Sequence, residues 1–332
     1  MSAFQNFCCG GFSVAKSNNS GGAWYEQKET ASSDTPLKLT LFLVRILPHW
    51  LLALLAFPVV FFYWISCPKA RAAASLFQKQ LCTFAKKKIR VNTYAQVYSF
   101  ALCLVEKFEG WCGKKKFSSI IYSDDDSAEL KNILAQKKGA VLIGSHLGNS
   151  ELLRSFASFG ETGVPIRVGV TAVADMKTTA KFNKAIAALN LSADMEVLPT
   201  EQIGAGTIEY LQQKVDSGGL VVLMGDRVSS SVPGRSLKQE FLGKEAAFPY
   251  GTFLMASMIE APVYYFFALR PKDITFSSKY DMLVKKSRVQ FLPGRKNRDL
   301  NLQNFSFEYA KVLQGHCMEH PFQWYNFFDF WA

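Results

Sequence analysis

The residue types best able to do chemistry come together in one short stretch of the chain, GSHLGNSE, from Gly144 to Glu151. His146 lies in its middle, and imidazole is the side chain whose ordinary pKa lets it accept and release a proton near neutral pH. Glu151 follows five residues later. Its carboxylate can hydrogen-bond one imidazole nitrogen, which fixes the tautomer and raises the basicity of the other nitrogen. The pair predicts a general base that removes a proton from an attacking hydroxyl.

A strand followed by a helix has to position this pair. The apolar run GAVLIGS, residues 139–145, predicts a buried strand that delivers His146 at its carboxyl end, where open α/β sheets place their sites. Asn149 or Ser150 can cap the next helix, which places Glu151 in the first turn. Residues five apart do not share a helix face, so His146 must lie in the loop between strand and helix for the two side chains to meet.

Spacing alone leaves a second interpretation open. H-x4-E is a short pattern, and a loop histidine with satisfied hydrogen bonds beside an ordinary first-turn glutamate explains it about equally well. We interpret Ser145 as structural, because the string is G-S-H-L-G and His146 holds the elbow position of the nucleophile motif G-x-S-x-G.

A second histidine pattern, H-x-x-E-H from His316 to His320, is typical of zinc peptidases, whose two histidines share a helix face. A third protein ligand should follow, but the remaining residues offer only Asp329 among aromatic side chains. We therefore expect a helix end without zinc. The aromatic ending FQWYNFFDFW is expected to pack in the core or to lie at a membrane interface.

Beyond residue 122 the chain alternates short apolar runs with helical patterns. Strands are expected at 139–145, 166–173, 196–199, 220–224 and 263–269, and helices at 203–215, 246–260 and 300–319. Strands that alternate with helices form a largely parallel sheet. Together with a helical stretch at 70–117, this predicts an α/β domain over residues 69–332, with a mixed, largely parallel sheet flanked by helices.

The N-terminal part divides into two segments of different composition. Residues 1–38 are rich in Ser, Gly, Asn and Thr, and are expected to form a disordered polar tail and not a signal peptide. Residues 39–68 hold an uncharged run from Trp50 to Cys67, which as a helix spans roughly 27 Å, about a hydrocarbon core. Pro58 should kink this membrane-associated helix. A kinked span, a re-entrant or interfacial helix, and a buried core helix all fit the run.

The charge of the chain indicates an anionic partner. The net charge is +11, and Lys and Arg are dense between Lys69 and Lys116, directly after the apolar run. The 28 Phe, 12 Tyr and 6 Trp favour a membrane surface over nucleic acid, because the basic residues follow an apolar run and do not form the arm that basic nucleic-acid-binding modules more often carry. The positive-inside rule places the C-terminal part in the cytoplasm, where the seven cysteines, which lack metal-like spacing, are expected to be reduced.

Three blocks, in order along the chain, resemble one family. They are SHLGNSELLR from Ser145, then GDR at 225–227 with EFLG at 240–243 and AAFPYG at 246–251, and finally the aromatic ending. The arrangement is similar to that of the lysophospholipid acyltransferase superfamily, in the branch of lipid A lauroyl/myristoyl acyltransferases, near its predicted acyltransferases of the aryl-polyene-associated type. The resemblance runs from about residue 40 to the C-terminus.

The resemblance implies an enzyme of the bacterial inner membrane with a glycerolipid acyltransferase-like fold and its catalytic domain on the cytoplasmic face. It would move a fatty acyl group from acyl carrier protein or CoA to a hydroxyl of a lipid or glycolipid. No metal or tightly bound cofactor is needed, since a thioester is already activated. Where the glycerolipid branch has an EGTR-type block, this chain reads FPYGTF, which argues against glycerol-3-phosphate or lysophosphatidate as the acceptor.

The same resemblance implies roles for individual residues. His146 would be the general base and Glu151 its partner. Arg227 would face the thioester oxygen or an acceptor phosphate, because a guanidinium keeps its charge and offers several donors. Asp226 would orient Arg227 or its loop. The residues expected to contact substrate are Asn149, Asp226, Phe248 and Gly251, the last two at a helix start that lines an acyl groove or packs in the core.

Two other functions stay open. A lipid thioester or ester hydrolase would use the same base with water in place of the acceptor hydroxyl, and would release free fatty acid whether or not an acceptor is present. A non-catalytic membrane lipid-binding protein would keep its function without His146.

Overall fold

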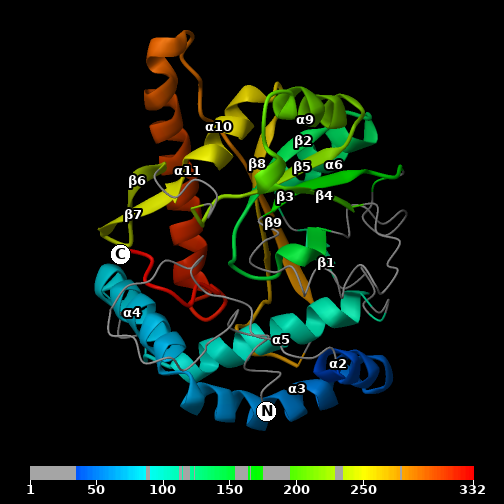
Figure 1. Ribbon diagram of the computed structural model, residues 1–332, viewed down its shortest axis with the longest axis vertical. Coiled ribbons are helices and arrows are strands. Elements are labelled where there is room, and N and C mark those ends of the chain that lie inside the picture. Colours follow the sequence, from blue (N-terminus) through cyan, green and yellow to red (C-terminus); the bar gives the residue numbers. More distant parts are fainter. Residues whose placement is uncertain are drawn as a thin grey trace.

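The computed structural model describes residues 35–86, 90–111, 114, 120–122, 124–153, 164, 166–174, 195–228, 235–276 and 279–332. The predicted polar tail lies outside these ranges, except for the start of helix α2 (Thr35–Ile46). Within them, helices cover a central sheet, and the N-terminal helices form a further layer at one end of it, at the bottom of the view (Figure 1).

The described residues form a seven-stranded sheet of order β1-β9-β8-β2-β5-β3-β4. Its strands are β1 (Ile120–Tyr122), β2 (Ala140–Gly144), β3 (Val170–Ala174), β4 (Met195–Pro199), β5 (Leu220–Met224), β8 (Val263–Leu269) and β9 (Tyr280–Lys286). Every neighbouring pair is parallel except β8 and β9, which are antiparallel. The prediction of a mixed, largely parallel α/β sheet is therefore confirmed.

The central strands are buried on both faces, because successive side chains of a strand point to opposite sides of the sheet. In β2, Val141 and Ile143 join one hydrophobic core, while Leu142 joins the core on the other face. The helices that pack around the sheet are α6 (Asp125–Ala135), α9 (Thr207–Asp216), α10 (Tyr250–Met258) and α11 (Arg298–Glu319). Continuous apolar runs such as AVLIG are what such doubly covered strands require.

One predicted helix, at residues 246–260, is wrong in its first part. Lys244–Pro249 is strand β7, which pairs with β6 (Ser236–Phe241) in an antiparallel hairpin, and α10 begins only at Tyr250. The turn residues Leu242 and Gly243 both have positive φ angles, of 53° and 78°. That geometry matches the twist of two paired strands, so the turn and the strand pairing outweigh the local helix propensity of Ala-Ala-Phe.

Other elements are shifted, divided or were not foreseen. Strand β3 starts at Val170, and α9 starts at Thr207, each four residues later than expected. The helical stretch at 70–117 is two helices, α4 (Pro68–Ala85) and α5 (Thr93–Trp111). Lys86, at the end of α4, takes the left-handed conformation that ends helices. β1, β9 and α6 had no counterpart in the prediction.

The predicted apolar run forms helix α3 (His49–Ser66), with Pro58 inside it. In the described part of the chain, α3 is the helix long and apolar enough to cross a membrane. Its inner face, which includes Ala53, Ala56 and Val60, packs in a core shared with α4 and α5. α5 contacts in turn the short 3₁₀ helix η3 (Ser150–Leu153), so it lies between α3 and the loop that carries His146.

Candidate active site

Two neighbouring strands bring His146 and Asp226 together. β2 and β5 are parallel, and Gly144, which ends β2, is paired in register with Met224, which ends β5. His146 and Asp226 each lie two residues beyond these ends, so both emerge at the carboxyl edge of the sheet. His146 Nδ1 lies 2.8 Å from Asp226 Oδ1, and the backbone N–H of His146 donates to Oδ2 of the same carboxylate at 2.8 Å.

Asp226 is fully buried and accepts further hydrogen bonds on Oδ2, from Trp324 Nε1 at 3.1 Å and from Asn326 Nδ2 at 3.3 Å. Burial raises the pKa of a carboxyl group, but the charge and hydrogen bonds of His146 and the charge of Arg227 outweigh it and lower the pKa of Asp226 to about 2. The carboxylate is therefore ionised at neutral pH. Asp226 was expected to orient Arg227 or its loop; in the structure its carboxylate binds His146 directly and is linked to Arg227 through Asn326.

The surroundings of His146 favour its neutral form. Burial and the positive charge of Arg227 lower the pKa of His146, which outweighs the opposite effect of Asp226. The ring is then uncharged at pH 7, with its proton on Nδ1 toward the Asp226 carboxylate and a lone pair on Nε2. The side chain is 30% exposed, so a substrate can approach it.

Arg227 is held beside this pair by the C-terminal segment. Its Nε donates to Asn326 Oδ1 at 2.7 Å, and its Nη2 donates to the Tyr325 carbonyl at 3.0 Å. The guanidinium also lies 5.7 Å from the centroid of the Phe328 ring. Burial lowers the pKa of Arg227 to about 10, so it stays charged at neutral pH. A cation of fixed orientation beside a neutral base can stabilise a negative charge that develops there.

The C-terminal segment thus builds the site, although the sequence indicated only packing or a membrane interface for it. The backbone N–H of Tyr325 donates to the His146 carbonyl at 3.0 Å, and Trp324 forms a β-bridge with Leu147. Trp324 also packs among aromatic rings of the core, so the packing prediction holds in part. The signal that could have found the second role is Asn326, a polar amide inside an aromatic run, because a buried amide needs hydrogen-bond partners.

Glu151 lies in η3, directly after the His146 loop. Its side chain lies outside the part of the chain that the structure describes, so its contact with His146 stays a prediction. Asn149, expected to contact substrate, is fully buried, and its Nδ2 donates to the Tyr280 hydroxyl at 3.4 Å. From this buried position the Asn149 side chain can order the loop that carries His146.

Phe248 and Gly251, expected at an acyl groove, lie in different environments. Phe248 ends a strand and not a helix turn, and it is fully buried against the rings of Phe241, Tyr309 and Phe330. Gly251 lies in the first turn of α10 and is exposed. Phe248 therefore takes the packing role that the sequence left open.

Gly148 is needed where the loop passes β8. Its φ is +76°, and a Cβ on it would lie 2.0 Å from the Ala268 carbonyl oxygen.

We expect Gly148→Ala to lower the free energy of unfolding by about 3 kcal/mol and to reduce activity with it. Gly251→Ala is the matched control, because nothing lies within 4 Å of a Cβ there. It should raise stability by at most about 1 kcal/mol. Denaturant unfolding and an activity assay check the expectations for both variants. Loss of activity in a stable Gly251→Ala protein would instead indicate that Gly251 contacts substrate.

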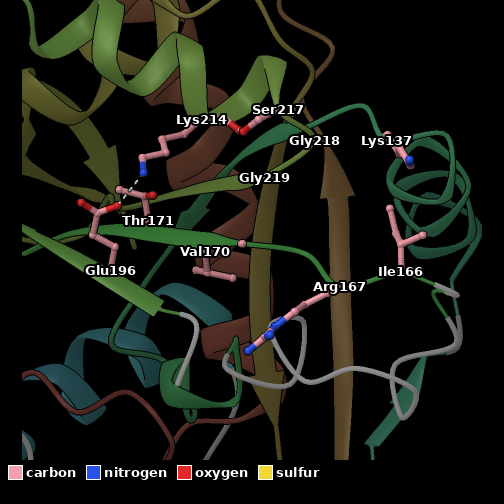
Figure 2. A pocket seen from close by; sticks show the side chains of 11 residues that line it. Lys137, Ile166, Arg167, Val170, Thr171, Glu196, Lys214, Ser217, Gly218 and Gly219 are labelled. Carbon is pink, nitrogen blue, oxygen red and sulfur yellow. Dashed lines mark hydrogen bonds and ion pairs between the residues drawn. The ribbon is translucent and has the colours of Figure 1, made fainter. Parts of the chain in front are cut away.

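A pocket of about 450 Å³ lies elsewhere (Figure 2). It is lined by residues around the start of β3 and by the turn before β5, including Arg167 and Gly219. Lys214 at its edge pairs with Glu196 at 2.9 Å. These are the amino ends of the parallel strands, opposite the edge that carries His146 and Asp226. The pocket is therefore separate from the candidate site.

The histidines of the H-x-x-E-H pattern have other partners. His316 Nδ1 lies 3.3 Å from Glu319, and His320 Nδ1 lies 3.6 Å from Asp273. Among the described residues, no three His, Cys, Asp or Glu side chains are grouped as a metal site would need. Both histidines lie at the end of α11, as the sequence predicted for a helix end.

Residues 41–331 match the model of a family described as bacterial lipid A biosynthesis acyltransferases. A comparison with curated individual proteins gives no match.

Proposed function

The chain belongs to the bacterial lipid A biosynthesis acyltransferase family, and we propose that it transfers a fatty acyl group from a thioester to a hydroxyl of a lipid or glycolipid. The family match confirms the resemblance drawn from the three motif blocks and indicates an acyltransferase. The observation that carries the finer proposal is the contact between His146 and Asp226 at the carboxyl edge of the sheet. It supports a general base that needs no nucleophilic side chain.

In the proposed reaction, His146 Nε2 removes the proton of the acceptor hydroxyl while that oxygen attacks the thioester carbonyl. The Asp226 carboxylate stabilises the imidazolium that forms. The tetrahedral intermediate then collapses, the carbon–sulfur bond breaks, and His146 returns its proton to the departing thiolate. The products are an acyl ester and a free thiol.

Arg227 is proposed to stabilise the oxyanion of that intermediate or to bind an acceptor phosphate. We expect Arg227→Met to lower kcat about 10²- to 10³-fold, the cost of removing an oxyanion donor. Because the Arg227 charge lowers the pKa of His146, its loss should raise that pKa. The acid limb of the kcat/KM profile should therefore move to higher pH. An unchanged acid limb would show that Arg227 acts away from His146.

The donor is proposed to be acyl carrier protein or acyl-CoA, and the acceptor a membrane lipid or glycolipid. Both donors are acidic, which fits the net charge of +11 on the chain. The thioester donor is already activated, so the proposal needs no metal or bound cofactor.

The N-terminal helices are proposed to hold the enzyme at the cytoplasmic face of the inner membrane. The large apolar side chains exposed on α2 and α3 are Leu39, Phe42, Ile46, Trp50, Leu54, Leu55, Phe57, Val59, Phe61, Phe62 and Ile65. Because the inner face of α3 packs against α4 and α5, we favour an interfacial helix over a span. An N-terminal tag should then be cleaved by protease added to inverted vesicles, and protection of the tag there would indicate a span.

The test of the proposed function is acceptor dependence. Purified protein would be incubated with labelled acyl carrier protein or acyl-CoA, with and without lipid extract from the source membrane. We expect labelled lipid to form only when the extract is present, and mass spectrometry of the product to identify the acceptor. Release of labelled fatty acid at the same rate without extract would instead establish the hydrolase. Absence of turnover with every donor, in folded protein, would favour the non-catalytic lipid-binding protein.

A further inference from the structure

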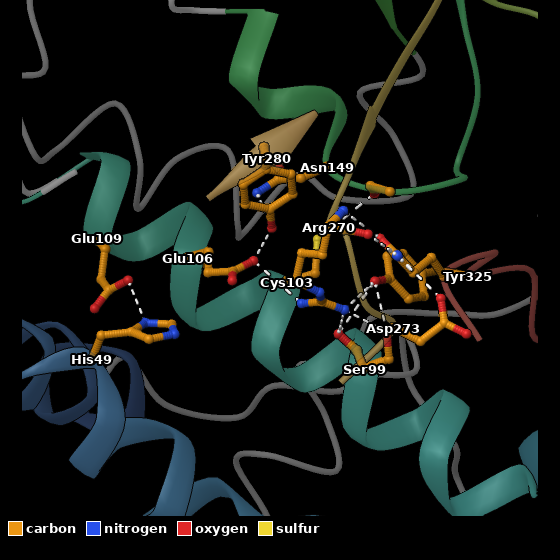
Figure 3. Close-up of polar contacts among 12 residues, drawn as sticks. His49, Ser99, Cys103, Glu106, Glu109, Asn149, Arg270, Asp273, Tyr280 and Tyr325 are labelled. Atoms are coloured by element: carbon orange, nitrogen blue, oxygen red, sulfur yellow. Dashed lines mark hydrogen bonds and ion pairs between the residues drawn. The ribbon is translucent and has the colours of Figure 1, made fainter. Parts of the chain in front are cut away.

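A buried ionic cluster joins α5 to the C-terminal segment (Figure 3). We define it as Ser99 and Glu106 on α5, Arg270 after β8, Tyr280 on β9, and Tyr325. Arg270 is fully buried, and its Nη1 lies 3.3 Å from Glu106 Oε2. Its Nη2 donates to the Ser99 carbonyl at 2.9 Å, to the Ser99 hydroxyl, and to the Tyr325 hydroxyl at 2.9 Å. The Tyr280 hydroxyl donates to Glu106.

The fold alone gives little reason for this cluster. Two charges removed from water cost several kcal/mol each, and apolar residues of similar volume often serve a core as well or better. The cluster is also at the functional edge of the sheet, because Arg270 directly follows the carboxyl end of β8, a parallel neighbour of β2. Its position indicates a connection with the site.

That connection runs through the C-terminal segment. The backbone of Arg270 exchanges two hydrogen bonds with the side chain of Gln323, at 2.9 and 2.8 Å. The Tyr325 hydroxyl is held by Arg270, while the Tyr325 backbone N–H donates to the His146 carbonyl and its carbonyl accepts from Arg227. The cluster thus holds the ring of Tyr325, while the backbone of Tyr325 is hydrogen-bonded to both proposed catalytic residues, His146 and Arg227.

We propose that Arg270 is a positioning residue, which with Glu106 and Ser99 holds the ring of Tyr325 and thereby fixes the backbone atoms that place His146 and Arg227. It does not touch substrate, because it is fully buried. The inference rests on the proposed function, in which His146 is the base and Arg227 the neighbouring cation. A displacement of about 1 Å at such a site is enough to cost roughly 100-fold in rate.

A pH profile separates this role from a merely structural one. Among the described residues, the charged groups that act on His146 are Asp226 and Arg227 after β5 and Lys107 on α5, and the Tyr309 hydroxyl of α11 donates to the Gly144 carbonyl two residues before it. If Tyr325 is released, Arg227 loses its hydrogen bond to the Tyr325 carbonyl and can move away from the imidazole. The pKa of His146 should then rise, so the acid limb of the kcat/KM profile should move to higher pH.

The sharpest variant is Tyr325→Phe, which removes one hydroxyl and leaves the ring and the backbone. We expect kcat to fall about 10- to 100-fold with KM within about twofold, and the acid limb to move to higher pH. Tyr98→Phe is the matched control. Tyr98, on α5, is also buried and donates its hydroxyl to a backbone carbonyl, but that carbonyl belongs to Ala53 of α3 and not to the C-terminal segment. It should keep the wild-type kcat and pH profile.

A second pair of changes guards against simple unfolding. Arg270→Met alone leaves Glu106 buried without its cation and is expected to destabilise the protein, whereas Arg270→Met with Glu106→Leu removes both charges and should fold. The double variant is expected to show the same fall in kcat and the same shifted acid limb as Tyr325→Phe. A folded double variant, or Tyr325→Phe, with wild-type kcat and pH profile would overturn the inference. Loss of activity in the His146→Asn variant, measured in parallel, would show that the proposed function itself stands.

Discussion

The substitution His146→Asn is expected to lower kcat about 10²- to 10⁴-fold in a folded protein, because it removes the nitrogen proposed to take the hydroxyl proton. The asparagine amide can place an N–H where Nδ1 lies, so the buried Asp226 carboxylate keeps a donor. An unpaired carboxylate there would cost stability on its own account. Turnover of the thioester with the lipid acceptor, measured together with thermal unfolding, checks both expectations.

The matched control for this change is His316→Asn. His316 is also an imidazole whose Nδ1 lies near a carboxylate, but that carboxylate is Glu319 of the same helix and not Asp226, and its ring packs on Phe267 of β8. It should keep wild-type turnover. Full activity in a folded His146→Asn protein would remove the catalytic proposal, and equal losses in both variants would show that histidine loss acts through stability.

The parts of the fold that could be predicted are those whose pattern is purely local. β5 and β8 match the predicted strands residue for residue, and β2 is one residue shorter at each end. Each is a continuous apolar run, as burial on both faces requires. α11 was also expected to within two residues of its start, because its apolar residues Leu302, Phe305, Tyr309 and Leu313 recur at helical spacing.

The parts that could not be predicted depend on partners far away in the chain. β7 reads as helix until it is paired with β6 across the Leu242–Gly243 turn. Strand β9 is tied to α6 by contacts about 160 residues apart, such as the Val284 N–H to Asp124. No window of 15 residues contains that information, so local propensity gave no strand there.

The difference between local patterns and contacts between distant parts of the chain also explains which site residues could be predicted. His146 and Glu151 stood out because they lie in one short string, and proximity in sequence made Glu151 the natural partner. Asp226 lies 80 residues away and reaches His146 only because β2 and β5 are neighbours in register. The sequence contained the clue that each residue closely follows an apolar strand, but the equal offset of two residues appears only with the strand ends of the structure. It became decisive only once the strand order was known.

The substitution Asp226→Asn is therefore expected to lower kcat on the order of 10⁴-fold, as loss of the orienting carboxylate does in hydrolytic triads. Each carboxylate oxygen now accepts from a different N–H of His146, Oδ1 from Nδ1 and Oδ2 from the backbone, so an amide would set its NH₂ group against one of these donors. The ring is then free to take the wrong tautomer. Because Asp226 raises the pKa of His146, its loss should also move the acid limb of kcat/KM to lower pH, opposite to Arg227→Met.

Glu151→Gln is the comparison that separates the two carboxylates. Nδ1 of His146 already lies against Asp226, so the glutamine variant should leave the acid limb where it is and lose less activity than Asp226→Asn. The opposite result would be an acid limb of kcat/KM that moves in Glu151→Gln and stays in place in Asp226→Asn. It would identify Glu151 as the carboxylate partner of His146 in the working enzyme. Since the two variants differ from wild type by one amide each, and both keep the shape of the side chain, the pH profile reports which carboxylate the imidazole senses.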